Sequence, residues 1–384
     1  MPSGRTNLLK TSPVAARRLY PLEQRARQKG SNYDRIAIVG CPSAMHLATG
    51  VSRNLKVPLI SAEIGKSPCG SPDVKINADL ENHWVFLIGN ANQGIDVLNR
   101  EISELESTVL QLGLMGPKRV IVTNPCFHYA RQDRIGEERE PLSASDMAAF
   151  LDTLAPTLAF GEHQDRVRIY QGRRIIGTFN TVDLHNPAIV GFFRTMPVNN
   201  LTLSKYFIRD IRRRFRKKLD EVKLTPPDLG RSKMVESYAK AIWGSAYAEH
   251  LVQASKSRSG HNVVGDAALI GDVAGKIVVV IDDIIDTAGT IEAIVYVLKQ
   301  SGAKEVHVMA THPIFSGQAP EKMNRILNED QVIDSLTISD TMQLRPEHQV
   351  EGMRIRSAVP LLSSVIERIY LGKSLSSAGL VYKG

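Results

Sequence analysis

Short apolar runs recur along the chain, and most of them lead into a stretch with helical periodicity. The runs are RIAIVG (35–40), WVFLIG (84–89), KRVIVTNP (118–125), IIGTFNTVDLH (175–185), KIVVVID (276–282) and KEVHVMATH (304–312). Helical periodicity is found around 43–54, 95–114, 143–155 and 290–302. A strand that is apolar at nearly every position is buried on both faces, and strands that alternate with helices build parallel sheets. The sequence therefore predicts an α/β protein whose mostly parallel sheets are flanked by helices.

The chain has 384 residues, which is long enough for two domains or one large one. No apolar run approaches the roughly 18–20 residues of a membrane span, so we expect no membrane partner. Cys41, Cys69 and Cys126 lie far apart without the spacing of a metal site. Such a pattern is typical of free thiols in a reducing compartment.

The net charge of +8 is concentrated in two segments. Residues 1–35 carry eight Lys and Arg against two acidic residues, and residues 209–223 carry eight against three. The rest of the chain has a net charge of −3, so we expect no nucleic-acid partner. The 209–223 run predicts a helix with a solvated charged face, and an anion-binding surface is the alternative interpretation.

Residues 1–34 form a basic N-terminal extension with three prolines and little apolar periodicity. We expect this extension to be disordered and the protein to be cytoplasmic. An Arg-rich, acid-poor N-terminus is also typical of organelle-targeting segments, so targeting to an organelle is the alternative.

The stretch VVVIDDIIDTAGT (278–290) places three carboxylates at the end of a predicted buried strand. Ligands of open α/β sheets bind at the carboxyl ends of the strands. The small and hydroxyl-bearing residues from Asp286 to Thr290 precede a helix, whose unpaired N–H groups attract phosphate. Asp282 and Asp283 would repel that phosphate, so we expect them to face sugar hydroxyls or a bound Mg²⁺. Ribose 5-phosphate, with a vicinal diol and a phosphate, would satisfy both halves of the stretch.

The residues from Asp282 to Thr290 resemble the phosphoribosyl-pyrophosphate loop of type I phosphoribosyltransferases and of ribose-phosphate pyrophosphokinases. Further motifs favour the second family. They are PCFHYARQDR (125–134), which is similar to the ATP-site segment of that family, PLSA (141–144), VDLH (182–185), GFF (191–193), VNNL (198–201) and THPIFSG (311–317). The resemblance covers roughly residues 35–375 in one order along the chain.

This resemblance implies a transferase that moves the diphosphoryl group of ATP to the C1 hydroxyl of ribose 5-phosphate. The products would be phosphoribosyl pyrophosphate, for nucleotide biosynthesis, and AMP. Asp282 and Asp283 would hold the ribose hydroxyls. The 5-phosphate would be held by Asp286, Thr287, Ala288, Gly289 and Thr290. ATP and ribose 5-phosphate are thus the implied substrates, and Mg²⁺ is the implied cofactor.

The resemblance also implies the residues on the ATP side. Arg131, Gln132 and Asp133 would bind ATP, and the Arg131 guanidinium would grip the phosphates as a fixed fork. His185 would contact an ATP phosphate and, as a neutral imidazole, ligate Mg²⁺. Asp228 matches the other metal-site carboxylate of the family.

Lys256 and Arg258 lie in the polar stretch QASKSRSGHN (253–262), which on composition alone would be a solvated surface loop. In the family, a Lys-x-Arg at this position lies on a mobile loop that closes over the triphosphate. Together with His185, these two cations are implied to be catalytic, because they would stabilise charge that develops in the transition state.

The family architecture consists of two type I phosphoribosyltransferase-like domains, expected here at 35–222 on the ATP side and at 223–375 with the ribose 5-phosphate loop. Pro226 and Pro227 cannot extend a helix and mark this boundary. A charged segment near 160–176 is expected to be an insertion, and the last helix to pack back on the first domain. Family members form hexamers built from dimers with an ADP or phosphate effector site, so we expect self-association.

Two departures from the family keep other functions open. The stretch SPCGSPDVKIN (67–77) stands where the family has its adenine-binding loop, and Arg231 stands where the family has a glycine. A non-catalytic regulatory subunit that assembles with an active homologue is one alternative. A phosphoribosyltransferase is another, because it would share the 282–290 loop but not the ATP-site segment.

Overall fold

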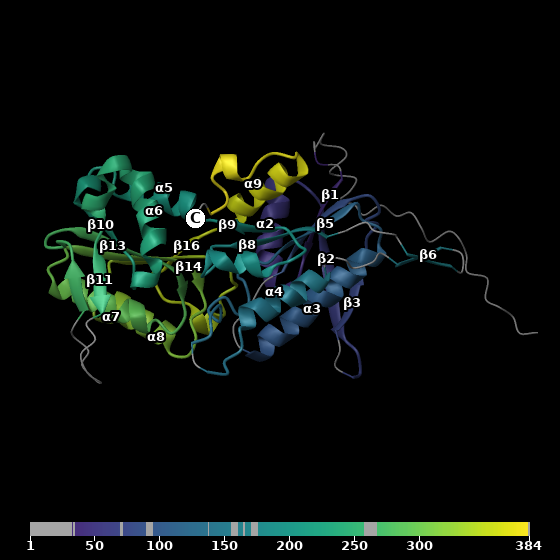
Figure 1. The fold of residues 1–384 in the computed structure, drawn as a ribbon, viewed down its shortest axis with the longest axis horizontal. Helices are drawn as coiled ribbons and strands as arrows, with labels where there is room; N and C mark the ends of the chain where they lie inside the picture. Colours follow the sequence, from purple (N-terminus) through teal and green to yellow (C-terminus); the bar gives the residue numbers. More distant parts are fainter. Residues whose placement is uncertain are drawn as a thin grey trace, which may run out of the picture.

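The computed structural model describes residues 33, 35–69, 72–89, 95–136, 138–154, 160–163, 166–169, 176–256 and 267–382. These residues form two main sheets that lie side by side along the long axis of the molecule (Figure 1). The first sheet is built from the N-terminal part of the chain, and the second from the C-terminal part.

The first sheet has seven strands in the order β3-β2-β1-β4-β5-β8-β9. All neighbouring strands are parallel except β2 and β3. The strands are β1 (Ile36–Gly40), β2 (Leu59–Lys66), β3 (Pro72–Ile76), β4 (Trp84–Ile88), β5 (Arg119–Thr123), β8 (Ile176–Val182) and β9 (Val198–Leu201). The flanking helices are α2 (Met45–Leu55), α3 (Ile95–Leu114) and α4 (Ser143–Leu154).

The second sheet has five parallel strands in the order β10-β13-β14-β15-β16. They are β10 (Val222–Thr225), β13 (Ile277–Ile285), β14 (Glu305–Pro313), β15 (Ser335–Ser339) and β16 (Arg354–Arg356). One face packs against α5 (Ser204–Arg214) and α6 (Ser232–Trp243), and the other against α7 (Gly289–Gln300) and α8 (Ala319–Asn324) (Figure 1).

The predicted α/β class is confirmed by this arrangement. Each of the six apolar runs contains a strand, and the four stretches with helical periodicity form α2, α3, α4 and α7. The near-continuous apolar composition of β13 follows from its position, because Val279 and Ile281 face α5 and α6 while Val278 and Val280 face α7.

One apolar core joins the two sheets. It contains Ile38 of β1, Val279 of β13 and Leu361 of α9 (Val359–Tyr370). The helix α9 follows the second sheet in sequence, yet it packs against α2 beside the first sheet (Figure 1). The shared core therefore fixes the loops of the first sheet relative to the carboxyl end of β13.

The helix predicted for 209–223 is wrong in its second half. The helix α5 ends at Arg214, and the strand β10 begins at Val222. Val222 pairs with Ile277 in the second sheet, and this pairing overrides the helical propensity of the basic residues before it.

Two antiparallel strand pairs lie outside the main sheets. Within the segment expected to be an insertion, β6 (Phe160–His163) pairs with β7 (Arg166–Ile169). The other pair is β11 (Gln253–Lys256) with β12 (Ala267–Ile270). Across the part of the chain that the structure describes, no helix has the length and apolar character needed to cross a membrane. The basic N-terminal extension, apart from Tyr33, falls outside the described residues.

Candidate active site

The carboxyl end of β13 carries the acidic residues, and α7 follows directly. Asp282 and Asp283 are the sixth and seventh residues of the strand, and Asp282 pairs in register with Ala310 of β14. The helix begins at Gly289, one residue before its predicted start. The acidic strand end and the helix N-terminus therefore lie on one continuous loop, as the sequence predicted.

Backbone geometry leaves space in front of the α7 N-terminus. Ala288 adopts a left-handed conformation with φ 61°, and this turns the chain into the helix. A side chain added at Gly289 would meet only Thr287 Oγ1 within 4 Å, at 3.9 Å. The backbone N–H of Ser316 donates to the Asp286 carbonyl at 3.0 Å, which ties the loop to the segment after β14. An anion can therefore approach the helix N-terminus closely.

Asp283 is the centre of a polar cluster that joins three separate segments. Its side chain is almost completely buried, and its Oδ2 lies 2.9 Å from His185 Nδ1. Its Oδ1 forms an ion pair with Arg231 Nε at 3.4 Å. His185 comes from the loop after β8, and Arg231 from the turn between β10 and α6. Side chains from both halves of the molecule thus meet at the end of β13.

The two adjacent carboxyls have opposite pKa shifts. Burial and the charge of Asp283 raise the pKa of Asp282 well above its usual value. Burial also acts to raise the pKa of Asp283, but the hydrogen bond from His185 and the charge of Arg231 outweigh it and lower that pKa. Asp283 therefore carries the negative charge of the pair, and its two cationic or proton-donating neighbours come from other segments.

Arg131, one of the residues predicted to bind ATP, lies against the 282–290 loop, which we call the acceptor loop. Its guanidinium forms an ion pair and hydrogen bond with the Asp286 carboxylate. Arg131 lies in a turn after β5, 155 positions before Asp286. Gln132 follows in the same turn, where its backbone N–H donates to the Tyr129 carbonyl at 2.8 Å. Asp133 is partly exposed next to it. The structure thus brings the predicted ATP-binding and phosphate-binding segments into contact.

His185 and Asp228 do not form a ready metal site in this arrangement. His185 Nδ1 faces Asp283, and its Nε2 lies 3.0 Å from Arg231 Nη2. Arg231 also donates to the His185 carbonyl. The Asp228 carboxylate accepts the Gly230 N–H at 2.8 Å as the cap of the short turn that carries Arg231. Among the described residues, no three His, Cys, Asp or Glu side chains gather as a metal would require. The donor set therefore does not fit a protein-held Mg²⁺ at His185.

A buried network beneath the site was not predicted. The carboxylate of Asp183 is buried, and its Oδ2 accepts the Leu203 N–H at 3.1 Å and the Thr311 hydroxyl at 2.8 Å. His312 Nε2 lies 2.9 Å from the Val182 carbonyl. These contacts join the loop after β8 to the end of β14. VDLH and THPIFSG were recognised as motifs, and the polar residues within them were the available signal.

The two predicted loop cations are mostly beyond the described part of the chain. Lys256 ends β11, where its backbone pairs with Ala267, but its side chain is not among the described features. Arg258 lies outside the described residues. Their implied catalytic role stays a prediction.

Two family models match the chain. The N-terminal domain of ribose phosphate pyrophosphokinase matches residues 36–154. The phosphoribosyl synthetase-associated domain matches residues 247–379. The first match covers β1 to β5 with the ATP-site segment, and the second covers β13 to β16 with the 282–290 loop.

Curated relatives match over most of the chain. The ribose-phosphate pyrophosphokinase of Buchnera aphidicola subsp. Acyrthosiphon pisum is 31% identical over 333 residues, covering 86% of this chain and 94% of that protein. The ribose-phosphate pyrophosphokinase 1 of Lactococcus lactis subsp. lactis is 30% identical over 348 residues, covering 90% and 96%. The crystal structure of phosphoribosylpyrophosphate synthetase from Mycobacterium smegmatis has the same fold, with a TM-score of 0.73, 24% identity and coverage of 88% and 99%. The chain belongs to the ribose-phosphate pyrophosphokinase family.

Proposed function

We propose that the cluster around Asp283 is the place where this chain carries out the reaction of its family. The enzyme transfers the diphosphoryl group of ATP to the C1 hydroxyl of ribose 5-phosphate, giving phosphoribosyl pyrophosphate and AMP. The single observation that carries the assignment is the meeting of His185, Arg231 and Asp283 beside an accessible helix N-terminus.

On the acceptor side, Asp282 and Asp283 hold the ribose hydroxyls, and the residues from Asp286 to Thr290 hold the 5-phosphate. The raised pKa of Asp282 and the lowered pKa of Asp283 give the pair one proton donor and one acceptor for a diol. The N–H groups at the start of α7 then receive the phosphate.

On the donor side, Arg131 binds the ATP phosphates together with Gln132 and Asp133. The Arg131 guanidinium already lies at the edge of the acceptor loop through its contact with Asp286. A triphosphate that replaces the Asp286 carboxylate as the partner of the Arg131 guanidinium would leave the transferred group next to the ribose. Phosphoryl transfer depends mainly on such positioning and on charge neutralisation, and Lys256 and Arg258 would add two further positive charges.

Mg²⁺ enters this scheme as part of the substrate MgATP, whose phosphate oxygens are the hard ligands that Mg²⁺ prefers. His185 orients Asp283 and lies next to the ATP phosphates. The Arg231 guanidinium lies 3.0 Å from His185 Nε2, where the family resemblance implies a metal ion, and it supplies a fixed positive charge there. Arg231 therefore takes over the charge-neutralising role at His185 in this chain.

The catalytic reading is favoured over both alternatives. The comparisons do not favour a regulatory subunit, and the acidic strand end, the helix N-terminus and the Arg131 turn are all present. A phosphoribosyltransferase would leave the match over residues 36–154 unexplained.

The assay that separates these functions uses the purified chain with MgATP and ribose 5-phosphate. We expect AMP and phosphoribosyl pyrophosphate in equal amounts. An inert chain that changes the rate of an active homologue would instead indicate a regulatory subunit. Turnover of a free base without ATP binding would indicate a phosphoribosyltransferase.

The family resemblance also supports proposals about assembly and location. We propose self-association into a hexamer built from dimers, with an ADP or phosphate effector at subunit contacts. Sedimentation velocity tests this, and a single monomeric species at assay concentrations would contradict it. We further propose a cytoplasmic location, with organelle targeting through residues 1–34 as the alternative. A fluorescent fusion with and without these residues distinguishes the two.

A further inference from the structure

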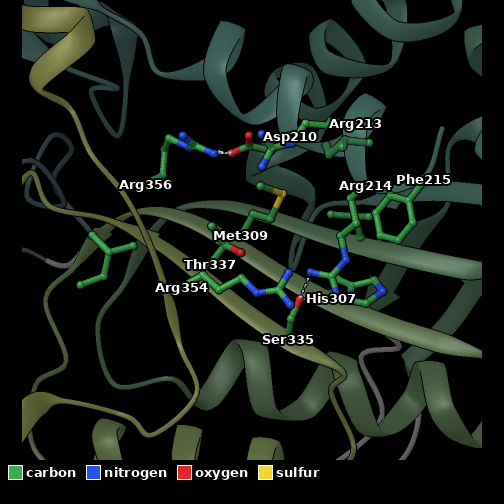
Figure 2. Close-up of a pocket in the computed structure, with 13 residues that line it drawn as sticks. Asp210, Arg213, Arg214, Phe215, His307, Met309, Ser335, Thr337, Arg354 and Arg356 are labelled. Atoms are coloured by element: carbon green, nitrogen blue, oxygen red, sulfur yellow. Dashed lines mark hydrogen bonds and ion pairs between the residues drawn. The ribbon is translucent and has the colours of Figure 1, made fainter.

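A cavity of about 260 Å³ lies between the end of α5 and one face of the second sheet, away from the carboxyl end of β13. Figure 2 shows arginines entering it from two directions. Arg213 and Arg214 come from the last turn of α5, and Arg354 and Arg356 come from the edge strand β16. Two basic elements that are far apart in sequence therefore line one space.

The charge of this cavity is only partly neutralised. Arg356 Nε donates to Asp210 Oδ2 at 2.6 Å, so the one carboxylate that lines the cavity is already paired. Within the described residues, no salt bridge joins Arg213, Arg214 or Arg354 to a carboxylate. The lining thus keeps three positive charges in excess.

Neighbouring groups show that these charges are crowded. Burial lowers the pKa of Arg214, and the charge of Arg354 lowers it further. Glu305 and Asp334 act in the opposite direction, but Asp334 pairs with Lys299. An anion between the guanidinium groups would relieve this repulsion, because guanidinium forks bind phosphate in pairs of charge-assisted hydrogen bonds.

Neutral polar groups complete the polar wall. Arg214 Nη1 donates to Ser335 Oγ at 2.8 Å, and the same Oγ lies 2.9 Å from His307 Nδ1. Burial and the charge of Arg214 lower the pKa of His307 to about 4, so the ring is neutral at pH 7. The apolar part of the wall, which includes Val279 and Met309, lies on the same sheet face as His307 and Ser335.

We propose that this cavity, the arginine pocket, binds a small anion with two to three negative charges, namely a phosphate or diphosphate group. A phosphate ester carries about −1.5 to −2 at pH 7, which matches the excess charge of the pocket. Its volume is just below the roughly 300–1,000 Å³ of sites for drug-sized ligands, which suits a group of this size. The site is separate from the catalytic loops and independent of the activity proposed above. Arg213 and Arg214 belong to the basic 209–223 run, so the proposal favours the anion-binding interpretation of that run.

The test compares anion binding to three forms of the full chain by calorimetry. The probes are inorganic phosphate, inorganic diphosphate and AMP. The forms are wild type, the double variant Arg214→Ala/Arg354→Ala, and Arg216→Ala. Arg216 follows the same helix end and is exposed, but it does not line the pocket, so it controls for net charge. Active-site binding is common to all three forms.

We expect wild type and Arg216→Ala to show one more binding site than the double variant, or at least roughly tenfold tighter binding there. Equal affinity for phosphate and AMP would identify free phosphate as the ligand, whereas tighter AMP binding would identify a nucleotide whose base covers the apolar wall. Both results support the pocket. The same number of sites and the same affinities in all three forms would overturn it.

A stability measurement separates ligand binding from a structural role of the arginines. Without added anion, Arg354→Ala should unfold at the same temperature as wild type or higher, because it removes repulsion. Phosphate should then raise the unfolding temperature of wild type more than that of the variant. A lower unfolding temperature for Arg354→Ala without anion, or binding of a single-stranded oligonucleotide with no effect of phosphate, would contradict the proposal.

Discussion

Arg231 is the single residue that most alters the family site in this chain. The sequence identified it as a departure, because an arginine follows Asp228-Leu-Gly. The sequence could not predict that the Arg231 side chain points toward His185, because the two residues lie 46 positions apart and meet only through the fold. The position of Asp282 and Asp283 near the end of a buried strand, in contrast, could be predicted from the strand and helix pattern around them. The local secondary structure could therefore be predicted from the sequence, but the contacts that each side chain makes with distant residues could not.

Replacing Arg231 should affect both stability and turnover. In Arg231→Ala, the almost fully buried Asp283 loses its ion pair with an arginine, and breaking a buried pair costs about 3–5 kcal/mol of unfolding free energy. Arg231→Lys retains the charge but not the fork, so its loss should be smaller. Urea denaturation and steady-state kinetics measure the two effects.

The same variant tests whether Arg231 does the work of a metal ion. If it does, free Mg²⁺ above the ATP concentration should restore part of the turnover of Arg231→Ala and leave wild type unchanged. Unchanged stability and turnover in Arg231→Ala would contradict the role given to this residue.

The opposite pKa shifts of Asp282 and Asp283 predict that replacing each carboxyl by an amide has opposite effects on stability. The pKa of Asp283 is lowered, so its ion pair stabilises the fold above the usual pKa of 3.8 and is lost as pH falls through the lower folded value. The pKa of Asp282 is raised, so stability falls as pH rises from 3.8 through the higher folded value. Near neutral pH, Asp282→Asn should therefore stabilise the unliganded protein by about 1–2 kcal/mol, and Asp283→Asn should destabilise it.

Thermal unfolding between pH 3 and pH 8 measures these slopes, and roughly the same slope for both variants would count against the assignment. Both variants should lose affinity for ribose 5-phosphate, which a purely structural role for Asp282 would not explain.

At the level of elements, the strands and helices with strong periodicity were predicted nearly to the residue. The exception was α5, where the sequence predicted a helix through 223. Basic residues favour helix at any of these positions, so the pattern held no stop signal. The end of the helix is set instead by the pairing of Val222 with β13, a contact between distant residues.

The packing of α9 on α2 can be tested at Gly50. A Cβ at this position would lie 2.5 Å from Val359 Cγ2, so Gly50→Ala forces the two helices apart. Overpacking costs about 1–3 kcal/mol, and the better helix propensity of Ala returns about 1 kcal/mol. We expect a net loss of up to about 2 kcal/mol in unfolding free energy.

The control removes the Val359 methyl groups with which the new Cβ would clash. In a Val359→Ala background, Gly50→Ala should become neutral or stabilising. Gly191→Ala, where a Cβ meets nothing within 4 Å, should change stability by less than about 0.5 kcal/mol. Equal losses from Gly50→Ala with and without Val359 would show that α9 does not pack as described.

At the scale of the whole molecule, the candidate active site is assembled because two sheets share one core. The sequence predicted both sheets and singled out Arg131 and Asp286, yet it did not predict that these two residues contact each other across the interface. Such contacts depend on how the halves are placed, and that placement follows from the packing of Ile38, Val279 and Leu361 in one core. No local pattern encodes it.

This contact predicts that Arg131 links the donor and acceptor sides. Arg131→Ala should raise the KM for ATP by roughly tenfold or more, because charge-assisted hydrogen bonds to phosphate are lost. Its effect on stability should be small, because about half of the Arg131 side chain is exposed. Arg134→Ala, in the same exposed turn, is the matched control. Equal KM values for ATP in both variants would argue against a specific ATP contact at Arg131.

The central claim is that the carboxyl end of β13 carries out diphosphoryl transfer, and ³¹P NMR of one reaction mixture tests it most directly. With MgATP and ribose 5-phosphate, wild type should convert ATP to AMP and a new diphosphate ester in equal amounts. In Asp283→Asn, both products should appear at least about a hundredfold more slowly. ADP as the product, or equal rates for wild type and Asp283→Asn, would contradict the account.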